Sequence, residues 1–87
     1  MNIVFSGKYA TNPQTFGINF DATVDGQSVI CTVSTEALQD IDPSNAQNTA
    51  VQQFLTNQSS FEAIAEKKIR AGAANPVTIN SSDVRGG

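Results

Sequence analysis

The most reactive side chain in this sequence is its single cysteine. A thiolate at Cys31 could act as a nucleophile or as a redox sensor. The chain contains no histidine, so no Ser/His or Cys/His pair, histidine metal site or histidine pH switch can be built from it. One cysteine also excludes an internal disulfide and a multi-cysteine zinc site. We therefore expect Cys31 to be a small buried hydrophobe rather than a reactive thiol.

Lys68 is the cation best placed to bind an anionic group. At about 100° per residue it falls between Phe61 and Ile64, on the apolar face of a predicted helix. Its ammonium could meet an anionic ligand or a partner's carboxylate there, with Lys67 and Arg70 at the rim. The alternative is that its methylene stem covers the edge of the core while the charge reaches water beside the helix C-terminus. Lys68, Lys67 and Arg70 are the candidate binding residues of this helix.

Tyr9 is a further candidate binding residue, because it is a large aromatic in a polar segment. The segment, residues 8–15, is expected to be a loop and is long for a hairpin connection. An exposed tyrosine often anchors an interface. The same ring could instead fold back as a lid on a small core, and the sequence leaves both interpretations open.

The acidic side chains do not form a recognisable site. Asp40 and Asp42 are neighbours in sequence and could share a cation with Asp21 or Glu36 if the helix start folds over the sheet. Their spacing matches no calcium loop or other ligand pattern. We therefore expect solvated helix caps, no metal site, no cofactor and no catalytic residues.

The C-terminal residues Arg85-Gly86-Gly87 suggest another chemistry. A free Gly-Gly end after a strand is similar to that of ubiquitin-like modifiers and sulfur carriers, which need a flexible terminus without side chains. Against this stand the additional helices and the long gap between Asn80 and Gly86. Residues 81–87 are otherwise expected to be a flexible tail, as at many termini.

A β-hairpin is the element that the sequence predicts most directly. Residues 16–24 alternate between apolar and polar, which is typical of a half-buried strand. Asp25-Gly26 follows, and this dipeptide favours a two-residue hairpin turn that fixes the register. Phe20 should then face Cys31 and Ile18 should face Val33, so that the thiol lies on the apolar side of the sheet.

The remaining elements complete an α+β domain. Residues 3–5 predict a first strand, Ser34 caps a helix from Thr35, and Asp42-Pro43 starts a second helix that runs to about Asn57. Ser59 to Glu62 forms a capping box for a third helix, or a sharp kink, before Gly72. Residues 77–80 predict a last strand at a sheet edge. The expected fold is a small antiparallel sheet, with three N-terminal strands and one C-terminal strand, covered on one face by two to three helices.

Composition limits the classes of partner. The chain has 87 residues, enough for a single domain. Five lysines and arginines stand against eight aspartates and glutamates, the wrong sign for a nucleic-acid binder. No apolar run is long enough to span a membrane, so we expect no membrane contact. A free cysteine suits a reducing compartment, which predicts a cytoplasmic protein.

Several segments together resemble a known family. They are the hairpin Val24-Asp25-Gly26 with Val29, Cys31, Val33 and Ser34, then Glu36-Ala37-Leu38, Phe54 with Asn57, and Phe61-Glu62 with Ile64, Ala65 and Lys67-Lys68-Ile69. The pattern is similar to the small bacterial domain-of-unknown-function family number fourteen eighty-eight, over roughly residues 16–80. The resemblance implies a single α+β domain without an assigned activity, and it supplies no catalytic residues.

The expected function is therefore non-catalytic binding. We expect a small cytoplasmic domain that binds an unknown protein partner, or a second copy of itself, through a sheet edge or its helical layer. The alternative is a small enzyme or anion-binding protein that uses Lys68 and carboxylates. The second alternative is a modifier or sulfur carrier that uses Gly86 and Gly87.

Overall fold

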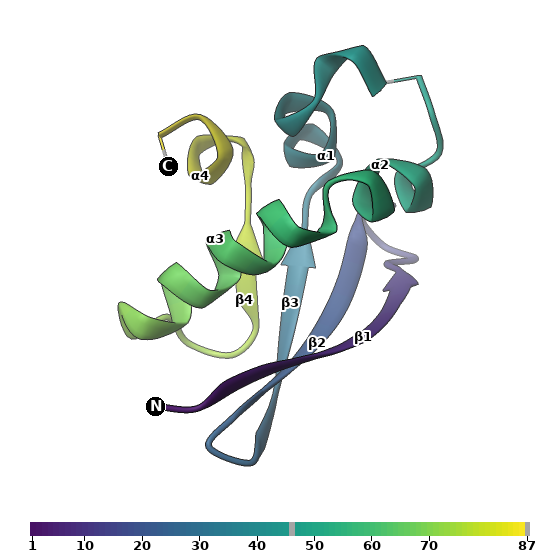
Figure 1. The fold of residues 1–87 in the computed structure, drawn as a ribbon. Helices are drawn as coiled ribbons and strands as arrows, with labels where there is room; N and C mark the ends of the chain where they lie inside the picture. The colour runs from purple at the N-terminus through teal and green to yellow at the C-terminus, as the bar shows by residue number, and fades with distance from the viewer. Residues whose placement is uncertain (46, 87) are drawn as a thin grey trace.

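The computed structural model describes residues 1–45 and 47–86 and has an α+β fold. Its elements, in chain order, are β1 (Ile3–Thr11), β2 (Ile18–Val24), β3 (Gln27–Val33), α1 (Thr35–Ile41), the 3-10 turn η1 (Pro43–Asn45), α2 (Ala50–Thr56), α3 (Gln58–Arg70), β4 (Val77–Ile79) and α4 (Ser81–Gly86). Within the described residues the four strands form one sheet in the order β1-β2-β3-β4. Figure 1 shows α3 lying across one face of this sheet.

The predicted hairpin is confirmed pair by pair. Phe20 lies opposite Cys31 and Ile18 opposite Val33, in the register that a two-residue turn requires. Asp25 and Gly26 have φ values of 51° and 85°, which the type I′ turn needs at both positions. The turn and the alternating pattern predict the same register because each depends on only a few neighbouring residues.

The α+β class and the four strands are confirmed, but the last strand enters the sheet in a different direction. β4 pairs with β3 in parallel, Cys31 with Val77 and Val33 with Ile79. The sheet is therefore mixed rather than antiparallel. The reason is the connection: β4 is reached through helices, and such a crossover returns the chain in the same direction.

The first strand is longer than predicted. β1 continues through Lys8 and Tyr9 to Thr11, where the sequence predicted a loop. Its pairing with β2 is irregular between Phe5 and Tyr9, with Gly7 at a φ of 83° in between. This bulge breaks the apolar alternation that would have revealed the strand.

Two helix boundaries differ from the prediction. The helix expected from residue 42 to residue 57 is a 3-10 turn followed by α2, whose N-cap Thr49 accepts a hydrogen bond from the backbone N–H of Gln52. The capping box expected at Ser59 is absent from the described structure, because α3 already begins at Gln58, directly after Asn57. The break near Asn57 is confirmed, and so is the Ser34 cap of α1, which accepts from the N–H of Ala37.

The C-terminal segment is also different. Residues 81–86 form α4 instead of a loose tail, and Gly87 lies outside the described residues. Asn80 caps this helix by accepting from the backbone N–H groups of Ser82 and Asp83, while the Asp83 carboxylate accepts from the N–H of Asn80. This reciprocal arrangement is that of a capping box.

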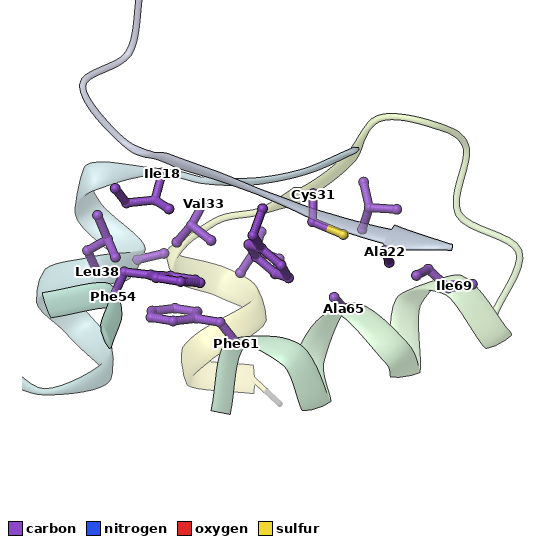
Figure 2. Packing of buried hydrophobic residues seen from close by; sticks show 13 residues of the cluster. Ile18, Ala22, Cys31, Val33, Leu38, Phe54, Phe61, Ala65 and Ile69 are labelled. Carbon is purple, nitrogen blue, oxygen red and sulfur yellow. The ribbon is translucent and has the colours of Figure 1, made fainter. Parts of the chain in front are cut away.

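The core lies between one face of the sheet and the helices (Figure 2). Phe54 is at its centre: its ring centroid lies 5.3 Å from that of Phe20 and 5.9 Å from that of Phe61. Alternate residues of β2 fill the sheet side, as predicted. Phe16, which the sequence predicted as the start of this strand, lies in the loop before β2 and is 69% exposed. The other sheet face carries Asn19, Thr32 and exposed Ile30, so the helices cover one face only.

Candidate functional site

Lys68 ties three elements together. Its Nζ donates a hydrogen bond to the backbone oxygen of Thr78 at 2.6 Å and to Oδ2 of Asp83 at 2.8 Å. The contacts join α3 to β4 and to the start of α4. The Lys68 ammonium, which the sequence offered as a group for binding an anionic ligand, thus binds groups of its own chain. This is closer to the alternative interpretation, in which Lys68 lies at the edge of the core.

The ion pair also sets the charge state of Asp83. Partial burial acts to raise the pKa of this carboxyl, but the hydrogen bonds from Lys68 and from the Asn80 N–H outweigh it. The pKa of Asp83 is therefore lowered from its ordinary value of 3.8. A second pair holds the other end of α4, with Nη2 of Arg85 3.0 Å from Oδ2 of Asp40.

The two rim cations do not join Lys68 in one site. Arg70 forms the predicted pair with Glu66, Nε to Oε2 at 3.3 Å, on the exposed side of α3. Lys67 is exposed. The predicted basic cluster is thus divided between an internal tie and the surface of α3.

Cys31 is buried, as predicted. It is fully shielded from solvent in the middle of β3, where Figure 2 shows its sulfur directed into the core. Burial, with a smaller contribution from the charge of Asp21, raises the pKa of the thiol to about 11. A protonated, inaccessible thiol is a poor nucleophile.

The acidic residues do not form a ligand set. Among residues 1–45 and 47–86, no group of three or more cysteine, aspartate or glutamate side chains is placed to hold a metal ion. In the same part of the chain, no helix has the length and apolar character needed to cross a bilayer.

Two open hollows on the described surface could hold a small ligand. One, of about 460 Å³, lies between the hairpin end and the end of α3, beside Asp25, Val29 and Ile69. The other, of about 440 Å³, lies on the open sheet face beside Lys8, Asp21 and Ile30. Lys68 lines neither hollow.

Tyr9 combines features of both interpretations left open by the sequence. It lies on β1 opposite Phe20, and its ring packs against Phe54 with the centroids 5.6 Å apart. It is still 39% exposed. Tyr9 therefore covers the core at the place where β1 meets α2, and part of its ring remains available to a partner.

The two edges of the sheet are unequal. β4 is three residues long, and the Ile79 carbonyl accepts from the backbone N–H of Ser34, on the β3 side. Because successive residues alternate in direction, the Thr78 carbonyl points away from β3, and it is this oxygen that Lys68 binds. The β4 edge is therefore short and covered by a lysine.

The β1 edge is long and open. Within residues 1–45 and 47–86, no strand lies beyond β1. The hydrogen bonds from Asp25 N–H to the Asn2 oxygen and from Asn12 N–H to the Gly17 oxygen show which residues face β2. By alternation, the backbone groups of four residues point outward. They are Ile3, Phe5, Tyr9 and Thr11.

Two further exposed side chains lie at this end of the sheet. Phe16, in the loop after β1, is 69% exposed and has a φ of 62°, a region that costs a non-glycine residue about 1–2 kcal/mol. Leu55, on α2, is 44% exposed. The exposed ring of Phe16 and its strained backbone do not stabilise the fold.

The sequence carries a signal for this region, but the signal lies in the absence of charge over whole segments and not in any single residue. Residues 43–61 and 9–20 contain no charged side chain, and residues 3–20 contain only Lys8. These segments include β1, the loop with Phe16, and α2. We give the name neutral side to the outward edge of β1 together with three exposed side chains, those of Tyr9, Phe16 and Leu55. Depletion of charge with exposed aromatic rings is typical of the centre of a protein interface.

The fold and this surface define a class: a small α+β domain with a one-sided sheet and one open edge. The family model described as "Protein of unknown function (DUF1488)" matches residues 3–79, and the chain belongs to this family. It is similar to the crystal structure, at 1.60 Å resolution, of a DUF1488 protein of unknown function from Shewanella loihica PV-4, with a TM-score of 0.78 and 23% identity over 91% of this chain and 94% of that one. No curated protein matches the chain.

Proposed function

We propose that this chain is a non-catalytic protein-interaction domain that binds through its neutral side. The observation that carries the proposal is Phe16, an exposed aromatic ring on a strained backbone in the loop that follows β1. Backbone strain of this kind is concentrated at functional sites, which supports a binding role for this residue.

The edge itself offers the second part of a binding surface. A strand added to β1 would satisfy the outward backbone groups, and alternate side chains would give specificity. Natural sheets usually shorten or cover such edges, as β4 does here. The length of the open β1 edge therefore supports a role for this edge in binding.

Catalysis is less well supported than binding. An enzyme would be expected to bring polar groups with displaced pKa values together in a cleft. The displaced groups found in residues 1–45 and 47–86 are the buried Cys31 thiol and the Asp83 carboxyl held by Lys68. Neither lines the two hollows described above. A free cysteine favours a reducing compartment, so we expect binding to take place in the cytoplasm.

The test is affinity capture from cells of the native host with three forms of the chain. Wild type should capture a specific partner. A co-expressed tagged copy of the chain itself also counts as a partner. Phe16→Gly should lose that partner, because it removes the ring, and Ile30→Gln should keep it. Ile30 is a matched control, since it is 39% exposed but lies on β3, which β2 separates from β1. Equal capture by all three forms would contradict binding through the neutral side.

A further inference from the structure

We propose that the partner of the neutral side is a second copy of this chain, with the two β1 strands antiparallel across a two-fold axis. This inference rests on the proposed function, because it names the occupant of the same surface. It predicts a dimer with one continuous sheet through both copies.

The outward groups of β1 are arranged symmetrically. Residues 3, 5, 9 and 11 face outward and lie in pairs about Gly7. Antiparallel pairing centred there places Ile3 opposite Thr11 of the second copy and Phe5 opposite Tyr9. Each outward residue then meets an outward residue, and the contact is the same seen from both copies. The Phe5–Tyr9 pair would add an aromatic cross-strand contact.

The irregular centre of β1 does not prevent this pairing. Gly7 sits near the axis, and a Cβ added there would find nothing within 4 Å. The bulges of the two copies therefore meet without side chains at their central residue. A regular strand that paired with β1 on both sides of the bulge would fall out of register. A second copy of β1 has the same bulge at the same place, so its outward residues keep the matching spacing.

Charge also favours a second copy at this surface. The chain has a net charge of -3, so two copies repel unless they meet where acidic groups are absent. All eight acidic residues lie outside residues 3–20 and 43–61. The one charge on β1, Lys8, lines the same hollow as Asp21 and so has an acidic neighbour within its own copy. Two neutral sides can therefore approach without apposed acidic groups.

The exposed side chains extend the contact beyond the backbone. Tyr9, which also packs on Phe54, belongs to the strand that would be paired. Phe16 follows that strand, and Leu55 lies on α2, the helix that Tyr9 contacts. Interfaces of this kind depend on a few aromatic anchors.

The experiment is sedimentation equilibrium of the full chain over a range of concentrations. Wild type should show reversible association from the monomer mass of 9.2 kDa to twice that mass. Phe16→Gly, Leu55→Gln and Thr11→Pro should each raise the dimer Kd about tenfold or more, equivalent to ~1.4 kcal/mol. Proline at residue 11 removes an outward N–H and so blocks the edge without removing a hydrogen bond to β2. Ile30→Gln is the control and should leave the Kd unchanged.

The outcomes separate this inference from the proposed function. A wild-type chain that remains monomeric up to about 1 mM overturns the second copy as partner, while host capture sensitive to Phe16→Gly would still support the interaction domain. A dimer that all three variants leave intact overturns the placement of the contact on the neutral side. Circular dichroism of each variant checks folding, and Phe16→Gly is expected to fold at least as well as wild type because it relieves the positive φ.

Discussion

The two edge strands of this sheet differ in length, in covering and in what their outward backbone groups bind. β4 spans three residues, and its outward Thr78 carbonyl is held by Lys68 at 2.6 Å. β1 spans nine residues, and its outward groups face no strand within residues 1–45 and 47–86. The charged side chain that looked most like a ligand group from the sequence thus closes one edge. The open edge, by contrast, lies where charged side chains other than Lys8 are absent, and it is there that we expect binding.

The largest loss of stability is expected at Phe54, whose ring packs against Tyr9 of β1. Phe54→Ala removes the ring that contacts Tyr9, Phe20 and Phe61, and a cavity of this kind costs about 3–5 kcal/mol. The free energy of unfolding from urea titration should fall by that amount. Phe54→Leu, which keeps most of the volume, should cost clearly less. Equal losses for the two variants would contradict this account, because they would mean that the lost volume does not determine the cost.

The second variant, Lys68→Met, tests the difference between the two edges directly, because it uncovers the β4 edge. Lys68→Met keeps the stem but removes both hydrogen bonds of the ammonium, which should lower stability by about 1–2 kcal/mol. Arg70→Met removes an exposed pair with Glu66 and should cost at most about 0.5 kcal/mol. Urea midpoints compare the two. A larger loss for Arg70→Met would contradict the role given to Lys68.

A smaller effect is expected at Phe16, and its sign is opposite. Glycine tolerates the φ of 62° found there, so Phe16→Gly should leave stability unchanged or raise it by up to about 1 kcal/mol. Thermal unfolding at low protein concentration measures this without a contribution from association. A loss of more than about 1 kcal/mol would show that the ring supports the fold, and would remove the argument that strain there serves binding.

The smallest effect concerns pH. The pKa of Asp83 is lowered in the folded chain, so its contribution is fully present above the ordinary value of 3.8 and is lost as the pH falls through the lower, folded value. Wild type should therefore lose more stability than Asp83→Asn between pH 5 and the acid range, by about 0.5–1 kcal/mol. Identical slopes for wild type and Asp83→Asn would exclude the Lys68 pair as a stabilising contact.

Local signals in the sequence predicted the hairpin and the buried thiol correctly. Asp25-Gly26 and the alternation around it act between neighbouring residues, and no distant segment overrides them. The extent of β1 could not be predicted in the same way, because the bulge at Gly7 interrupts its alternation and only pairing with β2 makes residues 8–11 a strand. The parallel direction of β4 depends on the path of the helices, which local patterns do not determine.

The candidate site was predicted less completely. Lys68 lies on a helix, α3, as predicted, but its partners lie ten and fifteen residues away. α4 had a readable signal, since Asn80 and Asp83 have the spacing of a capping box. The neutral side was missed because it is defined by charges that are absent from two separated segments, which only the fold brings together.

Amide hydrogen exchange at several protein concentrations tests the central claim most directly. If β1 is the edge that takes a second copy, exchange at Tyr9 and Thr11 should slow by about tenfold or more as the dimer forms, while the Thr78 amide should exchange at a constant rate. Rates at Tyr9 and Thr11 that do not change with concentration, or slowing confined to Thr78, would contradict this account.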